Sequence, residues 1–430
     1  MFSAEEFAIL CSDEVTAAIR NNIDRKPTDI ALDRRITHAS IVATQVKNLQ
    51  KARTKLPSYF AAQAIVPTLA YEQSSSEECA ARKHLSGESV LDLTCGLGVD
   101  ALALSKRFKR VVTIERNEMV AAVARENFRR LGAENIEVVC SSAEEYIANC
   151  AEHFDWCFSD PDRRGAKGEK LVRLEDCSPN VVALMPTLKR IADNVCIKCS
   201  PLFDVDEAFR LFGNCEVECV SLGGEAKEVN IYINGSTPQI TAVAIGIGEV
   251  TCRVEERNST MWSAQPGDLA NYRYITLPDA ALQHARMVAV AFAGKCDVWS
   301  NNGIALSTEK PKGVLGRTFE VEAIYEIDSA FKRMMRGRRA KIYRRDFPMA
   351  NAEICKRFRC SEGGSERWCF TRIGTKHLAI QLKTEPTLRS ESRGQTCLHY
   401  AASTDKLPTA CTSMQSSWSS FTHIPDKTYR

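Results

Sequence analysis

Two glycines and one acidic residue have the spacing of a nucleotide-binding turn. Gly96 and Gly98 follow a short apolar strand at residues 90–93, and Glu115 ends a second strand at residues 111–114. A turn without Cβ atoms allows positive φ and lets a ligand approach the backbone. A carboxylate roughly 20 residues after the first glycine can accept both hydroxyls of a ribose. The pattern predicts half of a nucleotide-binding βαβ unit, although the third glycine of a dinucleotide-binding turn is missing.

The residues around this turn resemble motif I of the class I S-adenosylmethionine (SAM) methyltransferases. The matching residues are Asp92-Leu93-Thr94-Cys95-Gly96-Leu97-Gly98, with Glu115 as the acidic end of the second strand. A glycine-rich turn of another α/β enzyme is the alternative. The resemblance implies SAM as the cofactor, held by Asp92, Thr94, Gly96, Gly98, Asp100, Glu115 and Arg116.

Two further stretches are candidates for cofactor contacts. In the methyltransferase fold an acidic residue often binds the adenine amine after the third strand, here residues 136–140. This chain has Ser142 there, so we expect a weaker contact or one through the backbone of Ala143. Gln73 and Ser74 lie in a polar stretch before a helix at residues 79–84. They either reach the methionine end of the cofactor or belong to a loop whose serines cap the helix.

Asp160 is the candidate catalytic residue, because it follows the fourth strand at residues 156–159. Methyl transfer from a sulfonium needs a nucleophile held roughly 3 to 3.5 Å from the methyl group and an acceptor for any released proton. Amino-methylating enzymes place Asp/Asn-Pro-Pro and an aromatic residue here. This chain keeps Asp160 and Pro161 but continues with Asp162 and Arg163. The stacking ring is therefore absent, which argues against methylation of an amine.

Basic residues near the same strand ends are candidate substrate contacts. Arg163 and Arg164 either bind a substrate anion or form ion pairs with Asp162 or Glu175. Lys198, at the end of a strand at residues 195–198, either borders the cleft or is an ordinary solvated lysine. We count Pro161 with these substrate contacts because it adjoins Asp160.

A second basic stretch lies near the C-terminus. It contains no acidic residue and consists of Lys332, Arg333, Arg336, Arg338, Arg339, Lys341, Arg344 and Arg345. On a helix, like charges at this spacing repel each other, and phosphates would offset the repulsion. We predict RNA contacts by Arg336, Arg338, Arg339 and Lys341, with an ordinary charged helix face as the alternative.

Composition limits the class of protein. The chain has 430 residues, 44% of them hydrophobic, and a net charge of +3, too small to argue for a polyanionic partner by itself. No stretch approaches the roughly 18 apolar residues of a membrane span, and the start lacks a signal peptide. We expect a cytoplasmic protein that binds no membrane. Its 18 cysteines, including Cys196 and Cys199, are scattered, so we interpret them as reduced and expect no metal.

The order of predicted elements suggests several domains. Residues 1–70 are predicted to be helical with Pro57 as a stop, and residues 71–235 alternate strands and helices, which favours a mostly parallel doubly wound sheet. A small α+β unit with a helix at residues 280–292 and a strand at residues 304–307 is expected over residues 236–315. A second unit follows at residues 316–385. We expect disorder in residues 386–430 because they are rich in serine and threonine and show no period.

Taken together, the chain resembles a bacterial family of class I SAM-dependent methyltransferases with a C-terminal THUMP-like domain. Beyond motif I, the matching blocks are Lys55-Leu56-Pro57, Glu72-Gln73-Ser74-Ser75-Ser76-Glu77, Asp160-Pro161-Asp162-Arg163-Arg164, Leu174-Glu175-Asp176-Cys177-Ser178-Pro179, Lys198-Cys199-Ser200-Pro201 and Arg345-Asp346-Phe347-Pro348.

The resemblance implies an α/β protein with a Rossmann-like class I methyltransferase domain, an N-terminal helical module, and a C-terminal α+β part made of ferredoxin-like and THUMP-like units. THUMP modules accompany RNA-modifying enzymes, so it also implies methylation of tRNA or rRNA. A protein or small-molecule methyltransferase, or a non-catalytic RNA-binding protein on the same fold, is the alternative.

Overall fold

The computed structural model describes residues 3–163, 173–259, 262–263 and 268–383. All of these residues fall within one compact unit, Met1–Thr384. Arg164, a predicted substrate contact, and residues 386–430, predicted to be disordered, lie outside the described residues.

The N-terminal region is helical, as predicted. Pro57 does not end the helical region but begins a new helix, because proline at the first helical position leaves no N–H without a partner. Ser76 then caps the seventh helix by accepting the N–H of Cys79 at 3.2 Å, so this part of the polar stretch is a helix cap. The helices are α1 (Ala4–Cys11), α2 (Asp13–Asn21), α3 (Pro27–Ala31), α4 (Ala39–Lys55), α5 (Pro57–Ala61), α6 (Thr68–Gln73) and α7 (Glu77–Arg82).

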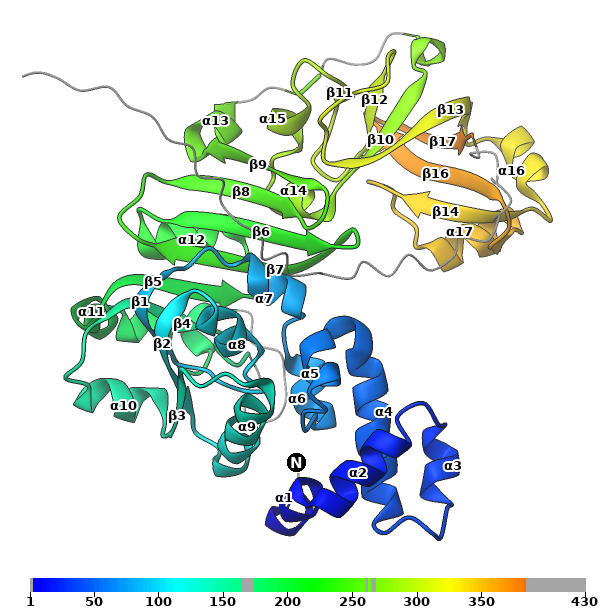
Figure 1. Ribbon diagram of the computed structural model, residues 1–430. Coiled ribbons are helices and arrows are strands. Elements are labelled where there is room, and N and C mark those ends of the chain that lie inside the picture. Colours follow the sequence, from blue (N-terminus) through cyan, green and yellow to red (C-terminus); the bar gives the residue numbers. More distant parts are fainter. Residues whose placement is uncertain (1–2, 164–172, 260–261, 264–267, 384–430) are drawn as a thin grey trace, which may run out of the picture. The chain divides into compact units, whose positions relative to one another are not determined.

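A nine-stranded sheet follows, with the order β3-β2-β1-β4-β5-β7-β6-β8-β9 among the described residues (Figure 1). The first five strands are parallel, and β7 runs antiparallel to β5 and β6. This is the mostly parallel α/β sheet that the alternating pattern predicts. The strands are β1 (Gly87–Asp92), β2 (Phe108–Glu115), β3 (Ile136–Cys140), β4 (Phe154–Ser159), β5 (Ala192–Cys199), β6 (Glu216–Leu222), β7 (Glu225–Ile233), β8 (Gln239–Ala244) and β9 (Gly248–Arg253).

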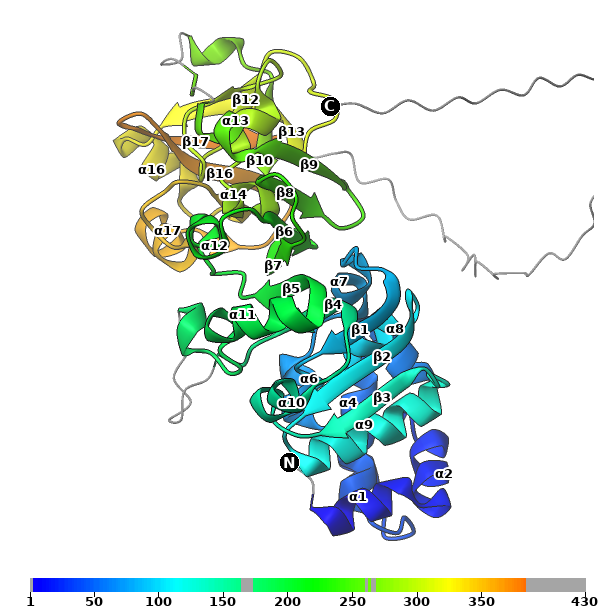
Figure 2. The ribbon, with the colours of Figure 1, turned by 90° about the vertical axis from the view of Figure 1, so that its left-hand side faces the viewer.

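Helices flank the parallel strands (Figure 2). One buried cluster joins the N-terminal module to α8, α9 and the sheet, and a second cluster joins α10, α11 and α12 to it. The carboxyl ends of β1, β2, β4 and β5 therefore meet at one edge, where α/β proteins bind ligands. These helices are α8 (Val99–Ser105), α9 (Glu118–Leu131), α10 (Ala143–Asn149), α11 (Val181–Ile191) and α12 (Val205–Phe212), with a short 3-10 helix at Leu174–Asp176.

The sheet does not end at the predicted domain boundary. β8 pairs in parallel with β6, and β9 pairs with β8, so residues 239–253 belong to the methyltransferase-like sheet rather than to a separate unit. Their short length and intervening turn made them look like part of another domain. The predicted boundary at residue 235 therefore falls inside the sheet.

A second sheet of eight strands contains the C-terminal part of the described chain. Its order is β11-β12-β10-β13-β17-β16-β14-β15. The long strand β13 pairs with β10 on one side and β17 on the other, so the predicted ferredoxin-like and THUMP-like units share this sheet. The strands are β10 (Tyr274–Pro278), β11 (Asp297–Val298), β12 (Ala305–Ser307), β13 (Gly316–Glu326), β14 (Arg339–Arg344), β15 (Ser361–Glu362), β16 (Glu366–Ile373) and β17 (Lys376–Leu382).

The prediction of one helix at residues 280–292 is wrong, and the alternative of an ordinary helix face for the basic stretch is excluded. The helix expected at residues 280–292 is broken, because Arg286 adopts a positive φ of 56° between α14 and α15. The basic stretch does not form one helix face, since it runs through α16, a turn at Gly337 and β14. The remaining helices are α13 (Val254–Ser259), α14 (Ala280–His284), α15 (Val288–Phe292), α16 (Ser329–Met335) and α17 (Asn351–Phe358), with a 3-10 helix at Leu269–Asn271.

Candidate active site

The turn after β1 is held by Asp92. Its carboxylate is fully buried and accepts hydrogen bonds from the backbone N–H of Thr94 at 2.9 Å and from the hydroxyl of Thr113 at 2.7 Å. Burial raises the pKa of Asp92 to about 7, against the lowering effect of these hydrogen bonds. Asp92 therefore fixes the shape of the turn, and its predicted part in cofactor binding is indirect.

The two glycines of the turn meet different surroundings. Both have positive φ, 53° at Gly96 and 86° at Gly98. A Cβ on Gly98 would overlap the ring of Phe128, so this glycine lets α9 pack against the turn. A Cβ on Gly96 would meet no atom within 4 Å. The open space beside Gly96 is thus the place where a ligand can approach the backbone.

Glu115 lies directly across this space. Its Oε2 accepts the N–H of Gly96 at 3.0 Å, and its Oε1 accepts the N–H of Asn117 at 2.9 Å. Each carboxylate oxygen has two lone pairs, so both keep acceptor capacity for the hydroxyls of a ribose. An open glycine backbone facing a fixed carboxylate fits the adenosine part of SAM.

The turn is linked to Asp160 through Thr94. The Thr94 hydroxyl accepts the N–H of Asp160 at 2.7 Å and contacts Asp92 at 3.3 Å. The structure therefore joins the predicted cofactor turn to the predicted catalytic residue. The side chain of Asp160 is 32% exposed, which leaves it accessible to a substrate.

Lys198 is not a solvated lysine at a strand end. Its side chain is only 10% exposed, and its Nζ lies 2.5 Å from Oδ2 of Asp160 and 2.7 Å from Oγ of Ser75. Ser75 in turn donates to Oδ2 of Asp100 at 2.7 Å. Burial alone would lower the pKa of Lys198, but Asp100 and Asp160 outweigh it and raise that pKa. Lys198 thus stays charged and holds Asp160 in place.

Lys83 extends this network into the core. Its Nζ lies 2.7 Å from Oδ1 of Asp100 and 2.9 Å from Oε1 of Glu228 on β7, and its side chain is 1% exposed. Burial would raise the pKa of Asp100, but Lys198 and Lys83 hold it below its usual value. Asp100 therefore bridges two buried lysines, which makes its predicted contact with a cofactor indirect. Neither Lys83 nor Glu228 belongs to a recognisable motif, so no pattern in the sequence pointed to them.

Two residues of the N-terminal module also reach this region. The Tyr59 hydroxyl donates to the carbonyl of Leu97 in the turn at 3.0 Å. Lys55 donates to the carbonyl of Tyr71 at 2.7 Å and lies over the Tyr71 ring. Burial and the nearby charge of Lys198 lower the pKa of Lys55 to about 8. The matching block at residues 55–57 is thus explained by its place beside the turn.

The other predicted cofactor residues have mixed surroundings. Ser74 donates to the carbonyl of Tyr71 at 3.0 Å, and Gln73 is exposed at the end of α6. The Ser142 hydroxyl caps α10 by accepting the N–H of Glu145 at 3.1 Å, and Ala143 is buried as the first residue of that helix. Arg116 is exposed and lies 3.4 Å from the hydroxyl of Ser178. Their part in cofactor binding stays a prediction.

The segment after Asp160 is pinned by backbone pairing. Pro161 is buried, and Asp162 forms a β-bridge with Ser178. Arg163 is exposed. Among the described residues, Glu175, offered as a structural partner for the arginines, lies 3.1 Å from Arg173 and 3.8 Å from Arg210. The role of Arg163 in substrate binding stays a prediction.

The residues predicted to contact RNA in the C-terminal part differ in their exposure and in their ion pairs. Arg336, Arg339 and Lys341 are exposed. Arg339 and Lys341 lie on the same face of β14, on either side of the buried Ala340. Arg338 lies 3.0 Å from Glu366 and also donates to the carbonyl of Met334, so its charge is already offset. The exposed three are the better candidates.

Cys196 and Cys199 are both buried and free in β5, on opposite faces of the strand. No group of three metal-binding side chains is found within the described ranges. In the same part of the chain, no helix combines the length and apolar character that crossing a membrane requires.

Comparison with known families now adds to this geometry. A methyltransferase domain model matches residues 90–162, which include the turn, Glu115 and Asp160. A model described as THUMP domain-like matches residues 316–384. The chain joins a methyltransferase domain to a THUMP-like domain. These matches confirm the predictions of a methyltransferase domain and of a THUMP-like domain, and with them the predicted fold class.

Curated relatives match part of the chain. They include the 23S rRNA (uracil(1939)-C(5))-methyltransferase RlmD of Edwardsiella ictaluri, 35% identical over 108 residues that make up 22% of this chain and 25% of the relative. Ribosomal RNA small subunit methyltransferase J of Coxiella burnetii is 30% identical over 127 residues, which cover 26% of this chain and 49% of the relative.

An uncharacterized S-adenosylmethionine-dependent methyltransferase of Mycobacterium tuberculosis is 27% identical over 157 residues, or 36% of this chain and 40% of that protein. The chain thus spans about a quarter to a half of the length of these curated relatives.

A solved structure shares the fold over most of the chain. The crystal structure of a candidate methyltransferase from Porphyromonas gingivalis W83 has a TM-score of 0.74 and 24% sequence identity, and the match covers 90% of this chain and 100% of that one. The arrangement of a methyltransferase-like sheet followed by a second sheet therefore recurs in another protein.

Proposed function

We propose that this protein is a SAM-dependent methyltransferase that acts on RNA. The observation that carries the proposal is a chain of hydrogen bonds at one sheet edge. Glu115 accepts from Gly96 of the turn, Asp92 holds Thr94 of the same turn, and Thr94 accepts from Asp160. The carboxylate proposed to bind the cofactor (Glu115), the open backbone of Gly96 and the proposed catalytic acid (Asp160) thus belong to one hydrogen-bonded unit.

The cofactor would be held mainly by the turn and Glu115. Glu115 would accept the ribose hydroxyls, and the absence of a side chain on Gly96 would let the nucleoside lie against the backbone. When bound, SAM supplies an electrophilic methyl group on a sulfonium.

Asp160 would position the group that receives the methyl. Lys198 holds one of its carboxylate oxygens at 2.5 Å, so the other oxygen is directed to accept a hydrogen bond or a proton from the substrate. No aromatic ring follows Asp160 in the motif, which favours a target other than an exocyclic amine.

Two features favour RNA as the substrate. The THUMP-like domain presents exposed Arg336, Arg339 and Lys341, which suit phosphate contacts. Two of the curated relatives named above are ribosomal RNA methyltransferases. We also propose a cytoplasmic location, because the RNA substrate and the cofactor are both found there.

The proposal is tested in two steps with the full chain. Calorimetric titration with SAM should show micromolar binding, and RNA from cells that lack the protein should accept tritiated methyl groups while RNA from complemented cells does not. Asp160→Asn is the matched control, because it should bind SAM but transfer little methyl.

The outcomes separate the competing functions. If the tritiated methyl groups entered protein or small molecules and not RNA, the substrate would belong to another class. Absence of SAM binding by a folded protein would rule out the enzyme and leave an RNA-binding protein on this fold.

A further inference from the structure

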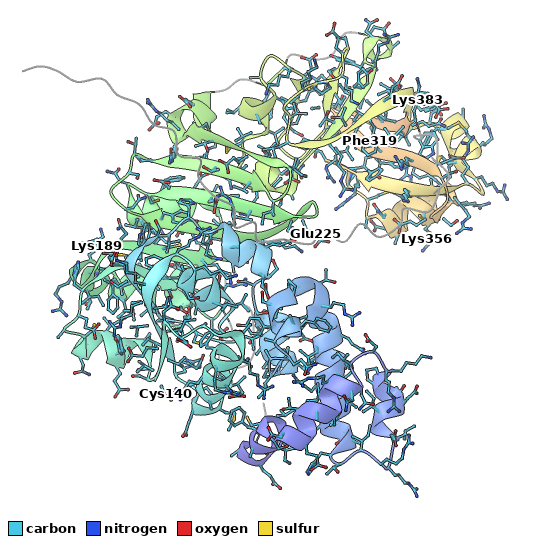
Figure 3. The ribbon with its side chains drawn as sticks, viewed as in Figure 1. Cys140, Lys189, Glu225, Phe319, Lys356 and Lys383 are labelled. Carbon is cyan, nitrogen blue, oxygen red and sulfur yellow. The ribbon has the colours of Figure 1, made fainter. Side chains whose placement is uncertain are left out.

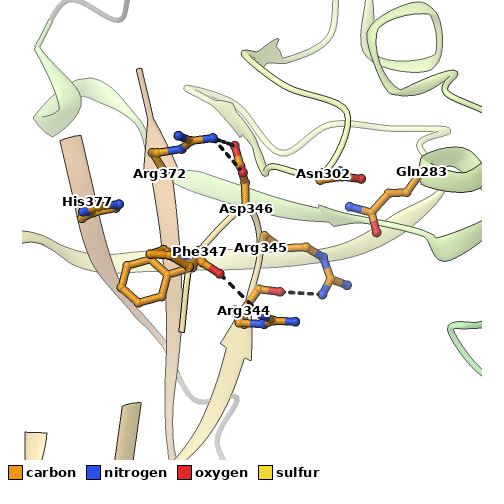
Figure 4. A pocket seen from close by; sticks show the side chains of 9 residues that line it. Gln283, Asn302, Arg344, Arg345, Asp346, Phe347, Arg372 and His377 are labelled. Carbon is orange, nitrogen blue, oxygen red and sulfur yellow. Dashed lines mark hydrogen bonds and ion pairs between the residues drawn. The ribbon is translucent and has the colours of Figure 1, made fainter. Parts of the chain in front are cut away.

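A pocket of about 490 Å³ opens beside the end of β14, away from the residues of the proposed active site (Figure 4). Volumes of this size are typical of small-ligand sites. The lining residues come from the end of β14 and the loop after it, from β16 and β17, and from the segments around α14 and β12. They are Gln283, Asn302, Arg344, Arg345, Asp346, Phe347, Pro348, Arg372 and His377.

The pocket carries an excess of positive charge. It has three arginines and one acid, Asp346. That acid is already engaged, because it lies 3.1 Å from Arg372 and accepts the Ser300 hydroxyl at 3.0 Å. Within the described residues, neither Arg344 nor Arg345 has an acidic partner within ion-pair distance, and each donates only to a backbone carbonyl.

The side chain of Arg345 is incompletely hydrogen-bonded. Its Nε is buried and has no hydrogen-bond partner in the described part of the chain. Burial lowers the pKa of Arg345, which reflects the cost of a charge withdrawn from water. A half-buried guanidinium whose Nε has no hydrogen-bond partner in the described part of the chain is unfavourable, and an anion in the pocket would offset that cost.

We propose that this pocket binds a phosphate group. Guanidinium groups present paired N–H donors that match two phosphate oxygens, and here two unpaired guanidiniums border one cavity. The cavity also leaves room for a nucleoside attached to the phosphate. The assignment of that phosphate to an RNA rests on the proposed function, and a free phosphorylated metabolite is the other possible source.

The test uses the full-length protein at constant ionic strength, because nucleic-acid affinity depends steeply on salt. Inorganic phosphate is titrated by calorimetry, and a short fluorescein-labelled RNA is titrated by anisotropy, with inorganic phosphate as a competitor. The variants are Arg345→Met and Arg344→Gln, the second at an exposed position where folding is not at risk. Lys356→Gln removes a charge from the exposed surface of α17 and serves as the control (Figure 3).

We expect both pocket variants to lose about tenfold or more in affinity for inorganic phosphate, the range of a charge-assisted hydrogen bond, while Lys356→Gln does not. A parallel loss of RNA affinity, with phosphate competing in the wild type, would assign the phosphate to RNA. Unchanged RNA affinity would overturn the RNA source and support a small phosphorylated ligand.

The pocket assignment itself would be overturned if the wild type did not bind phosphate or if both variants bound it normally. The residues proposed to bind SAM and to transfer the methyl group lie outside this pocket, so the proposed function would survive that result. Conversely, phosphate binding with no methyl transfer would leave the pocket assignment intact.

Discussion

The ammonium group of Lys198 lies 2.5 Å from the carboxylate of Asp160, across the ends of two neighbouring parallel strands. Asp160 is partly exposed, whereas Lys198 is nearly buried and is anchored on its other side by Ser75 and Asp100. The Asp160 carboxylate is therefore oriented from the protein interior. Lys198 acts as a positioning residue for Asp160.

Lys198→Met should lower the rate of methyl transfer about tenfold to a hundredfold and change SAM affinity little. Without the ammonium, the Asp160 carboxylate loses the hydrogen bond that orients it, so kcat should fall while KM for SAM changes little. The measurement is kcat and KM for methyl transfer with tritiated SAM and RNA from cells that lack the protein.

Lys189→Met on the exposed end of α11 is the matched control, and Lys198→Arg should recover part of the activity (Figure 3). An unchanged kcat in Lys198→Met would show that Lys198 does not act through Asp160.

Lys83→Met should destabilise the fold by about 3 to 5 kcal/mol, because it leaves the buried carboxylate of Glu228 without its counter-charge and leaves Asp100 with Lys198 alone. Adding Glu228→Gln to Lys83→Met should restore part of the loss by removing one of those charges. Urea unfolding measures both effects. Lys106→Met, at an exposed position, should change little. A loss of less than about 1 kcal/mol for Lys83→Met would mean that the network contributes little net stability.

Glu115→Ala should weaken SAM binding at least about tenfold, since a hydrogen bond to a charged group contributes about 1.5 to 3 kcal/mol. Glu115→Gln keeps one acceptor oxygen and should fall between the wild type and the alanine variant. Calorimetric titration gives the affinities, and circular dichroism checks folding because Glu115 also binds the N–H of Gly96. Glu118→Ala, on the neighbouring exposed turn, is the control. Equal affinity in all four proteins would remove Glu115 from the cofactor site.

The local pattern of the methyltransferase domain was predictable from the sequence, and the partners of its charged residues were not. The helix at Glu118–Leu131 and the strand at Ile136–Cys140 follow directly from hydrophobic periodicity. The pairing of Lys198 with Asp160 depends on which strands become neighbours, and that of Lys83 with Glu228 joins residues 145 positions apart. Periodicity holds no information on such contacts.

The errors have the same origin. β8 and β9 look like part of a new domain until the parallel pairing of β6 with β8 is known. The break at Arg286 depends on a single backbone angle, which the apolar pattern of residues 280–292 does not encode.

Alanine substitutions at the two glycines of the turn should have different effects. Gly98→Ala should destabilise the fold by about 2 to 3 kcal/mol, because it combines an unfavourable φ with overlap of the Phe128 ring. Gly96→Ala carries only the cost of positive φ, about 1 kcal/mol, yet its Cβ would enter the proposed cofactor space. Thermal unfolding and SAM titration of both variants separate the two roles. A stable Gly96→Ala protein with normal SAM affinity would contradict the proposed position of the cofactor.

Asp92 should make the fold less stable as the pH rises from about 4 to about 7. Burial raises its pKa to about 7 in the folded protein, whereas the unfolded chain has the ordinary value near 3.9. Between these values the folded state binds the proton of Asp92 more tightly than the unfolded state does. The stabilisation of the fold by protonated Asp92 is therefore complete at low pH and is lost as the pH rises. The difference of about three pH units corresponds to up to about 4 kcal/mol.

Asp92→Asn cannot ionise, so its unfolding free energy should decline less than that of the wild type over this range. Asp29→Asn, at an exposed carboxyl, corrects for the general effect of losing an acid. The measurement is urea unfolding at several pH values. Parallel curves for wild type and Asp92→Asn would show that Asp92 is ionised in the folded protein throughout, because the hydrogen bonds from Thr94 and Thr113 would then compensate for its burial.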